Sequence, residues 1–103
     1  MQVVIKRPGK EQTPGELTQE EIYDLVAPND YPEFVTFNDV YNIGMYVHDS
    51  GKILGRGKNF VHNSNIIYGT VVFVGLDKEG RAIDISGTQY HIVKDYLEIK
   101  SLR

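Results

Sequence analysis

The chain has 103 residues, of which 41% are hydrophobic, so it contains enough apolar material for one core in a single domain spanning residues 1–103. Its 11 basic and 14 acidic residues give a net charge of −3, which excludes the electrostatic attraction to phosphate on which tight, general nucleic-acid binding depends. It contains no cysteine, which excludes a disulfide framework and a zinc site with thiolate ligands.

The N-terminal part of the chain predicts a strand followed by a short helix. Residues 2–6 have the pattern of a strand and lack the long apolar stretch of a secretion signal, so we expect a cytoplasmic protein with no membrane segment. Residues 10–16 are polar and predict a loop. Thr18 and Glu21 have the spacing of a capping box, which predicts that a helix begins here, and Pro28 ends it.

The following segments predict a strand and then a hairpin. The apolar residues within 33–37 indicate the strand. Further along, residues 43–47 and 53–54 flank the sequence His-Asp-Ser-Gly at residues 48–51, in which the Asp favours a turn and the Gly a left-handed backbone. This pattern predicts a hairpin in which residues 43–47 pair with residues 53–54.

The longest apolar run of the chain, residues 65–75, predicts the central strand. Both of its alternating faces are apolar, so a strand over residues 66–74 is expected to be covered on both sides. The sequence Asp-Lys-Glu-Gly at residues 77–80 predicts a turn, after which residues 81–85 return as a neighbouring strand.

The C-terminal segment predicts a second helix. Ser86 and Gln89 form another capping-box pair, and apolar residues recur at helical spacing from Tyr90 to Leu97. Two short helices and about six strands, mostly in hairpins, predict a single α+β domain with a mostly antiparallel sheet, present as a monomer or a small oligomer.

The chain carries no pattern of a catalytic or cofactor site. Its glycine-rich segment 51–59 resembles a phosphate-binding loop, but the glycine spacing is wrong, Asn59 stands where such loops have a hydroxyl, and no helix pattern follows. The three histidines, His48, His62 and His91, are spaced too widely to indicate a metal site. We therefore expect no cofactor, no metal and no enzymatic activity, and a small hydrolase is retained as an alternative.

A basic, glycine-containing segment, residues 51–65, is the candidate binding surface. It lacks the apolar periodicity that packing would require, and loops held by a rigid sheet are where binding residues concentrate. The start of the second strand is its expected neighbour. The candidate ligand- or partner-binding residues are Lys52, Arg56, Lys58, Asn59, Phe60, Tyr31 and Glu33.

Three interpretations of this segment follow from the sequence. A protein partner would use an exposed aromatic anchor such as Phe60 or Tyr31, ringed by charge. A small anionic ligand, such as a nucleotide, would need Lys52, Arg56 and Lys58 to converge on one concavity. In the third interpretation the segment is a solvated connection, and its glycines serve only its turns.

Short motifs along nearly the whole chain resemble one family. They are Val3–Gly9, Glu21–Val26, the pair Tyr31 and Glu33, Asp49–Lys52, Asn59, Ile67–Thr70 and Val74–Gly75. On these motifs the chain resembles DUF3846, a family of small uncharacterised proteins common in phages, plasmids and other mobile elements of bacteria. It departs from the family at Ala27–Asp30, where a Gly-Gly pair usually precedes the tyrosine. The resemblance implies the fold and a mobile-element origin, and it supplies no catalytic residue.

These observations together predict a function in binding. We expect a non-enzymatic accessory protein of a phage or mobile element that contacts a host or phage macromolecule in the cytoplasm of the bacterial host. The alternative is a protein that binds or sequesters a small anionic, nucleotide-like ligand.

Overall fold

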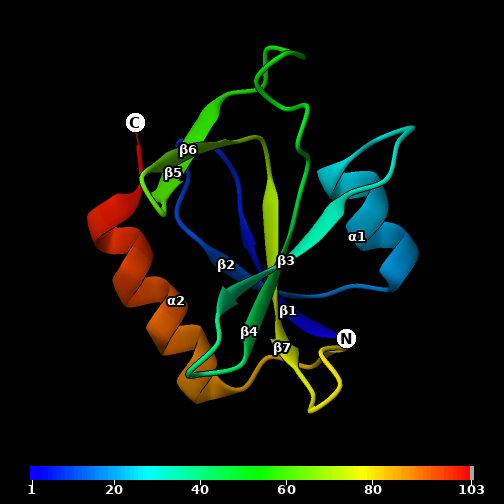
Figure 1. Cartoon of the computed structure of the whole chain (residues 1–103), viewed down its shortest axis with the longest axis vertical. Helices are drawn as coiled ribbons and strands as arrows, with labels where there is room; N and C mark the ends of the chain where they lie inside the picture. The colour runs from blue at the N-terminus through cyan, green and yellow to red at the C-terminus, as the bar shows by residue number, and fades with distance from the viewer. Residues whose placement is uncertain (103) are drawn as a thin grey trace.

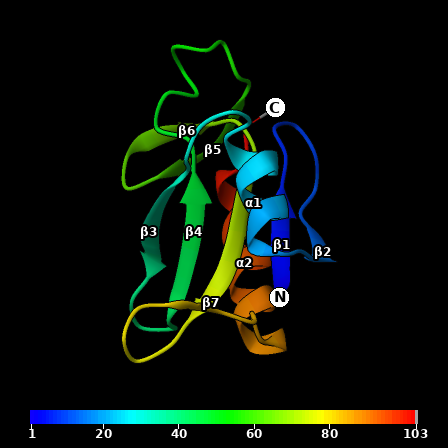
Figure 2. The ribbon, with the colours of Figure 1, turned by 90° about the vertical axis from the view of Figure 1, so that its right-hand side faces the viewer.

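Residues 1–102 are described by the computed structural model, in which an antiparallel sheet carries one helix on each face (Figure 1). The elements in chain order are β1 (Gln2–Lys6), β2 (Thr13–Glu16), α1 (Gln19–Val26), β3 (Glu33–Asn38), β4 (Ile43–Val47), β5 (Lys58–His62), β6 (Asn65–Tyr68), β7 (Val71–Leu76), β8 (Ala82–Ile83) and α2 (Gly87–Lys100). Figure 2 shows the sheet with α1 in front of it and α2 behind it.

The main sheet has six strands in the order β2-β1-β7-β4-β3, with β8 paired to the end of β7, and all of its pairings are antiparallel. Strands β5 and β6 form a separate hairpin. Phe60 of this hairpin packs in the same cluster as Val93 and Leu97 of α2, so the hairpin and α2 cover the same face of the sheet. The α+β class expected from the sequence is confirmed.

The centre of the fold is β7, whose residues Val71 to Val74 are fully buried. Val71 and Phe73 belong to the core cluster under α2, whereas Val72 and Val74 belong to the cluster under α1. Successive residues of a strand point to opposite faces, so a strand that is covered on both sides must be apolar throughout. The predicted central strand with two buried faces is confirmed for this part of the run.

The apolar run does not, however, form one strand from residue 66 to residue 74. It breaks at Gly69, which has a φ of +82° that favours glycine, and whose amide donates to the Gly57 carbonyl at 2.8 Å. Before the break, β6 pairs with β5, and after it, β7 enters the main sheet. A single continuous strand was therefore the wrong prediction, and the glycine is the physical cause of the break.

The expected loop over residues 10–16 contains a strand, because β2 pairs with β1 at the edge of the sheet. Pro14 lies opposite Val4 in this pairing. A proline is tolerated in an edge strand, where its missing N–H can face away from the neighbouring strand.

The predicted hairpin between residues 43–47 and residues 53–54 is also wrong. Both edges of β4 are occupied by other strands, β3 and β7, so no edge remains for residues 53–54. These residues lie in a loop of turns, with the Ile53 side chain 87% exposed. The turn at residues 48–51 does form, since the Gly51 amide donates to the His48 carbonyl at 3.0 Å.

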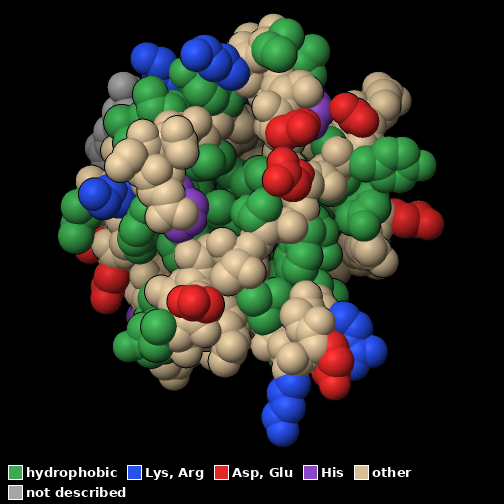
Figure 3. Space-filling view, viewed as in Figure 1, with side chains coloured by type: hydrophobic (Ala, Val, Ile, Leu, Met, Phe, Trp, Pro, Cys, Tyr) green, Lys and Arg blue, Asp and Glu red, His purple; other side chains and the backbone are tan. Residues whose placement is uncertain are grey.

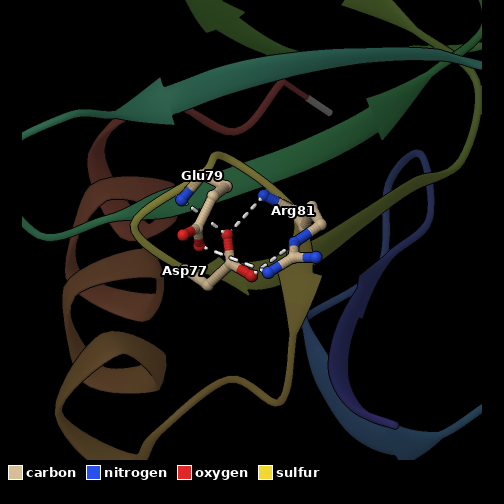
Figure 4. Close-up of polar contacts among 3 residues, drawn as sticks. All are labelled: Asp77, Glu79 and Arg81. Carbon is tan, nitrogen blue, oxygen red and sulfur yellow. Dashed lines mark hydrogen bonds and ion pairs between the residues drawn. The ribbon is translucent and has the colours of Figure 1, made fainter.

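The predicted turn after β7 is confirmed and is held by one aspartate (Figure 4). Asp77 accepts hydrogen bonds from the backbone amides of Glu79 and Arg81 at 2.9 and 2.8 Å. The Arg81 guanidinium also donates to Asp77 at 2.9 Å and to Glu79 at 3.3 Å. The Arg81 amide, with these other donors, holds the pKa of Asp77 below its usual range. β8 then pairs with β7, but over Ala82–Ile83 only, which is shorter than the expected strand over residues 81–85.

Both helices begin where the capping boxes predict. The Glu21 amide donates to the Thr18 hydroxyl and the Thr18 amide to the Glu21 carboxylate, at 3.1 and 3.0 Å. Ser86 and Gln89 make the same reciprocal pair, at 3.1 and 2.8 Å. Among residues 1–102, neither helix has the length and apolar character that crossing a membrane requires.

Candidate functional site

A groove of about 580 Å³ lies between the main sheet and the β5–β6 hairpin. Its floor is apolar and comes from Val35 of β3 and from Met45 and Val47 of β4, which are neighbouring strands. Figure 3 looks onto this face and shows hydrophobic atoms in its middle, with acidic and histidine side chains around them. We call this cavity the β3–β6 groove.

One wall of the groove is the edge of β6. All four residues of this strand, Asn65 to Tyr68, line the cavity, although their side chains alternate between two faces of the strand. It is therefore the backbone edge that borders the groove. β5 pairs with the other edge, and within residues 1–102 β5 is the only strand that pairs with β6.

The two ends of the groove differ in chemistry. At one end, near the tip of the hairpin, the His62 ring stacks on Phe37 of β3 with 5.0 Å between ring centroids. The other end carries the charged side chains of Glu33, Asp49 and Lys52. This charged end also lies beside the end of β6, since a Cβ added at Gly51 would lie 2.9 Å from the Tyr68 carbonyl oxygen.

His62 is held in one neutral form by its neighbours. The Tyr96 hydroxyl donates to the Val61 carbonyl at 2.8 Å, so it can only accept from Nδ1–H of His62, 3.2 Å away. Nε2 then accepts from the Asn63 side-chain amide at 3.3 Å. Burial lowers the pKa of His62, in agreement with a neutral ring.

We expect stability to fall as the pH is lowered from about 7 to about 5.5, because burial lowers the pKa of His62 in the fold, so the unfolded chain takes up a proton there more readily than the folded chain. Urea unfolding at several pH values measures this slope, and His62→Gln should flatten it. An equal slope in parent and variant would contradict the assignment.

A second fall in stability is expected below about pH 4. Glu21, Asp30 and Asp77 have lowered pKa values in the fold, and their protonation at this pH removes the stability that their carboxylates contribute.

A second histidine, His48, joins the groove to the segment after α1. Its Nε2 lies 3.1 Å from the Asp30 carboxylate, and the side chains of the two residues are 1% and 57% exposed. The Tyr31 backbone amide, and then the His48 ring, hold the pKa of Asp30 below its usual value. Nδ1 of His48 is buried and has no hydrogen-bond partner within residues 1–102. The pair fixes the turn at residue 30 to the end of β4.

The predicted cations do not converge on one site. Lys52 lines the β3–β6 groove, but Arg56 and Lys58 are not among its lining residues in the described chain. The Arg56 side chain instead lies against Gly69, where an added Cβ would be 3.1 Å from its Cδ. Lys58 is exposed at the start of β5. The convergent cation site expected for an anionic ligand is therefore not formed by these three side chains.

Two of the candidate binding residues lie in the interior. Asn59 is fully buried: its Oδ1 accepts from Lys6 Nζ at 2.9 Å, and its Nδ2 donates to the carbonyls of Lys6 and Gly69 at 2.8 and 2.7 Å. Phe60 is also fully buried, with its ring against Phe73 at 5.8 Å. The expectation of an exposed aromatic anchor at Phe60 is wrong, because the strand turns this side chain into the core.

The two remaining candidates are separated from each other. Glu33 lines the groove at its charged end. Tyr31 is 79% exposed and contacts the edge of Tyr23, and it lines a different hollow together with Glu20 and Asp24 of α1. Only Glu33 therefore neighbours the candidate surface in the way the sequence suggested.

The apolar floor and the β6 wall were not identified from the sequence. One signal was available: Asn63-Ser64 stands between the apolar pairs 60–61 and 66–67, a pattern typical of a hairpin with a two-residue turn. Both turn residues have positive φ, at 49° and 65°, as such turns require. Val35, Met45 and Val47 gave no separate signal, since strand residues of this kind are usually core.

Comparison with known proteins assigns the chain to a family. The family described as "Domain of unknown function (DUF3846)" matches residues 1–99. The chain belongs to the DUF3846 family. No curated protein and no solved structure matches it significantly.

In this DUF3846 protein, three of the motifs that carried the resemblance meet beside the groove. The turn Asp49–Lys52 contacts the segment Ile67–Thr70, since Gly51 sits against the Tyr68 carbonyl. The Gly69 carbonyl of the same segment accepts from Asn59. The family assignment confirms the resemblance, and these contacts show that the three motifs fix the β5–β6 hairpin to the loop after β4.

Proposed function

We propose that this protein is a non-enzymatic binding module that holds a segment of a partner protein in the β3–β6 groove. The observation that carries this proposal is an apolar floor bordered by an edge of β6 with which no strand of residues 1–102 pairs. We further propose that it acts in the cytoplasm of a bacterium as an accessory protein of a phage or mobile element. The resemblance to the DUF3846 family supports that setting.

The size and lining of the groove support binding of a chain segment. At about 580 Å³ the groove has the size of an ordinary ligand pocket, so it has room for the side chains of a short segment. Val35, Met45 and Val47 offer apolar surface to the side chains of a partner, and Asn63 and Asn65 add hydrogen-bonding amides at one end.

The contacts of the two histidines support binding rather than hydrolysis. The His48 side chain is buried and bound to Asp30, and the His62 ring is stacked on Phe37 and hydrogen-bonded to Tyr96. These contacts hold both rings in place and give each of them a structural role. A screen for nucleotide and peptide hydrolysis tests this part of the proposal, and turnover that is lost in His62→Gln would contradict it.

The alternative, a small anionic ligand, is less well supported by the groove. Lys52 favours an anion there, but Glu33 and Asp49 line the same cavity and oppose one. The negative balance of the whole chain also argues against general nucleic-acid binding.

A photo-crosslinking amino acid at Asn65, which is exposed at the groove, tests the proposal in a bacterial host. The same amino acid at Lys78, on the exposed turn after β7, is the control. We expect a protein to be crosslinked from position 65 and not from position 78. Identical crosslinked species from the two positions would contradict the groove as the binding site.

The identified partner can then be titrated against purified variants. Val35→Lys places a charge on the apolar floor and is expected to weaken binding at least about tenfold, or roughly 1.4 kcal/mol. Val40→Lys is the matched control, because Val40 is 76% exposed in the connection between β3 and β4. Equal affinities of the two variants would overturn the proposal.

A further inference from the structure

We infer that the partner segment binds as an added β-strand along the open edge of β6, with a cationic side chain at the end of the groove that holds Glu33 and Asp49. This inference rests on the proposed function and specifies the conformation and chemistry of the ligand. It follows from the hydrogen-bonding pattern of the hairpin and from the charges at the groove.

The hairpin pattern shows which peptide groups of β6 face the groove. Residues 63 and 64 form a two-residue turn with positive φ at both positions, so the flanking pair, His62 and Asn65, exchanges backbone hydrogen bonds. The next pair, Val61 and Ile66, is then a non-hydrogen-bonded pair. The N–H and C=O of Ile66 therefore point away from β5 and towards the groove.

Unpaired peptide groups on a strand edge are a template for another extended chain. The main-chain hydrogen bonds of such an added strand supply affinity, and its alternate side chains supply specificity. β6 has four residues, so it can pair with about four residues of partner, or roughly 13 Å of extended chain. Alternate side chains of that strand would face the apolar floor at Val35, Met45 and Val47.

The charged end of the groove defines the preferred partner further. Glu33 and Asp49 line it together with one cation, Lys52, so carboxylates are in excess there. Asp30 adds another negative charge near this end, because its carboxylate lies 3.1 Å from Nε2 of His48, which lines the groove. A lysine or arginine in the partner strand is attracted to this end, whereas an acidic residue is repelled.

The probe for this inference is a random-peptide library selected on the purified protein, followed by titration of synthetic copies of the enriched peptides. We expect enriched sequences in which apolar residues alternate and a basic residue lies at one end. Nuclear magnetic resonance titration should shift the Ile66 amide resonance. Methylation of the peptide nitrogens that pair with β6 should weaken binding at least about tenfold, because it removes the donors of the added strand.

Variants of the protein test the strand pairing and the charge separately. Ile66→Pro removes the N–H that faces the groove and no N–H that pairs with β5, and Ile66→Ala keeps it; melting curves verify that both fold. We expect Ile66→Pro to bind at least about tenfold more weakly than Ile66→Ala. Glu33→Gln and Asp49→Asn should weaken binding of basic peptides, whereas Lys52→Gln should strengthen it.

The outcomes separate this inference from the proposed function. Peptides whose binding is lost in Val35→Lys but unchanged by nitrogen methylation and by Ile66→Pro would overturn strand addition and keep the groove as the site. A library that yields no peptide, or only peptides unaffected by Val35→Lys, would overturn both. Self-association that Val35→Lys abolishes, measured by sedimentation, would identify a second copy as the occupant and overturn the partner assignment.

Discussion

Val72→Asp is expected to unfold the protein. Val72 has no exposed surface and lies in β7 between Ile5 of β1 and Tyr46 of β4. Its side chain packs in the cluster that holds Ile22 and Val26 of α1. A carboxylate buried there without a partner costs several kcal/mol, a large part of the roughly 5–15 kcal/mol that stabilises a typical domain. Circular dichroism at 25 °C should show a largely unfolded chain.

The same substitution at an exposed valine is the matched control for this experiment. Val40 is 76% exposed in the turn before β4, so Val40→Asp should melt within a few degrees of the parent. A Val72→Asp protein that melts as cooperatively as Val40→Asp, and at a similar temperature, would show that β7 is not the buried centre of the sheet.

The parts of the fold that the sequence predicted correctly depend on neighbouring residues. Thr18 with Glu21, and Ser86 with Gln89, satisfy helix-end amides within a span of four residues, so their spacing alone locates both helices. β7 was recognisable for a related reason. A strand covered on both faces must be apolar at every position, and residues 71–74 are.

The parts that were missed depend on contacts between distant segments. β2 is a strand because β1 offers it an edge, and its sequence Thr-Pro-Gly-Glu carries no alternation of its own. Residues 53–54 looked like a strand, but β4 has both edges occupied by β3 and β7. Local propensity cannot show which edge of a strand is free, because this depends on the order of strands in the sheet.

Of the seven candidate binding residues, the structure brings only two to one groove. Lys52 and Glu33 line the groove, as expected for neighbours of one surface. Phe60 and Asn59 were expected at the surface because they follow a basic loop, yet a bulge between residues 58 and 60 and contacts with β1 and α2 bury them. A buried polar residue can be distinguished from an exposed one only when its distant partners are known.

Asn59→Ala is expected to destabilise the fold by about 3 kcal/mol, since buried polar groups left without partners cost about 1–3 kcal/mol each. The asparagine side chain connects three groups, Lys6 Nζ and the carbonyls of Lys6 and Gly69, and so joins β1 to the break between β6 and β7. A loss of this size lowers the melting temperature of a domain of this length by roughly 15 °C. Thermal unfolding followed by circular dichroism measures the shift.

The matched control is Asn65→Ala, because Asn65 is exposed and its side chain donates only to the nearby Asn63 carbonyl among the described contacts. It should shift the melting temperature by no more than about 3 °C, as is usual for surface substitutions. The two asparagines therefore compare a buried position with an exposed one: Asn59→Ala is expected to lower stability, whereas Asn65→Ala is expected to leave it nearly unchanged. An Asn59→Ala protein as stable as Asn65→Ala would show that Asn59 does not hold the hairpin to β1 and would return it to the set of surface candidates.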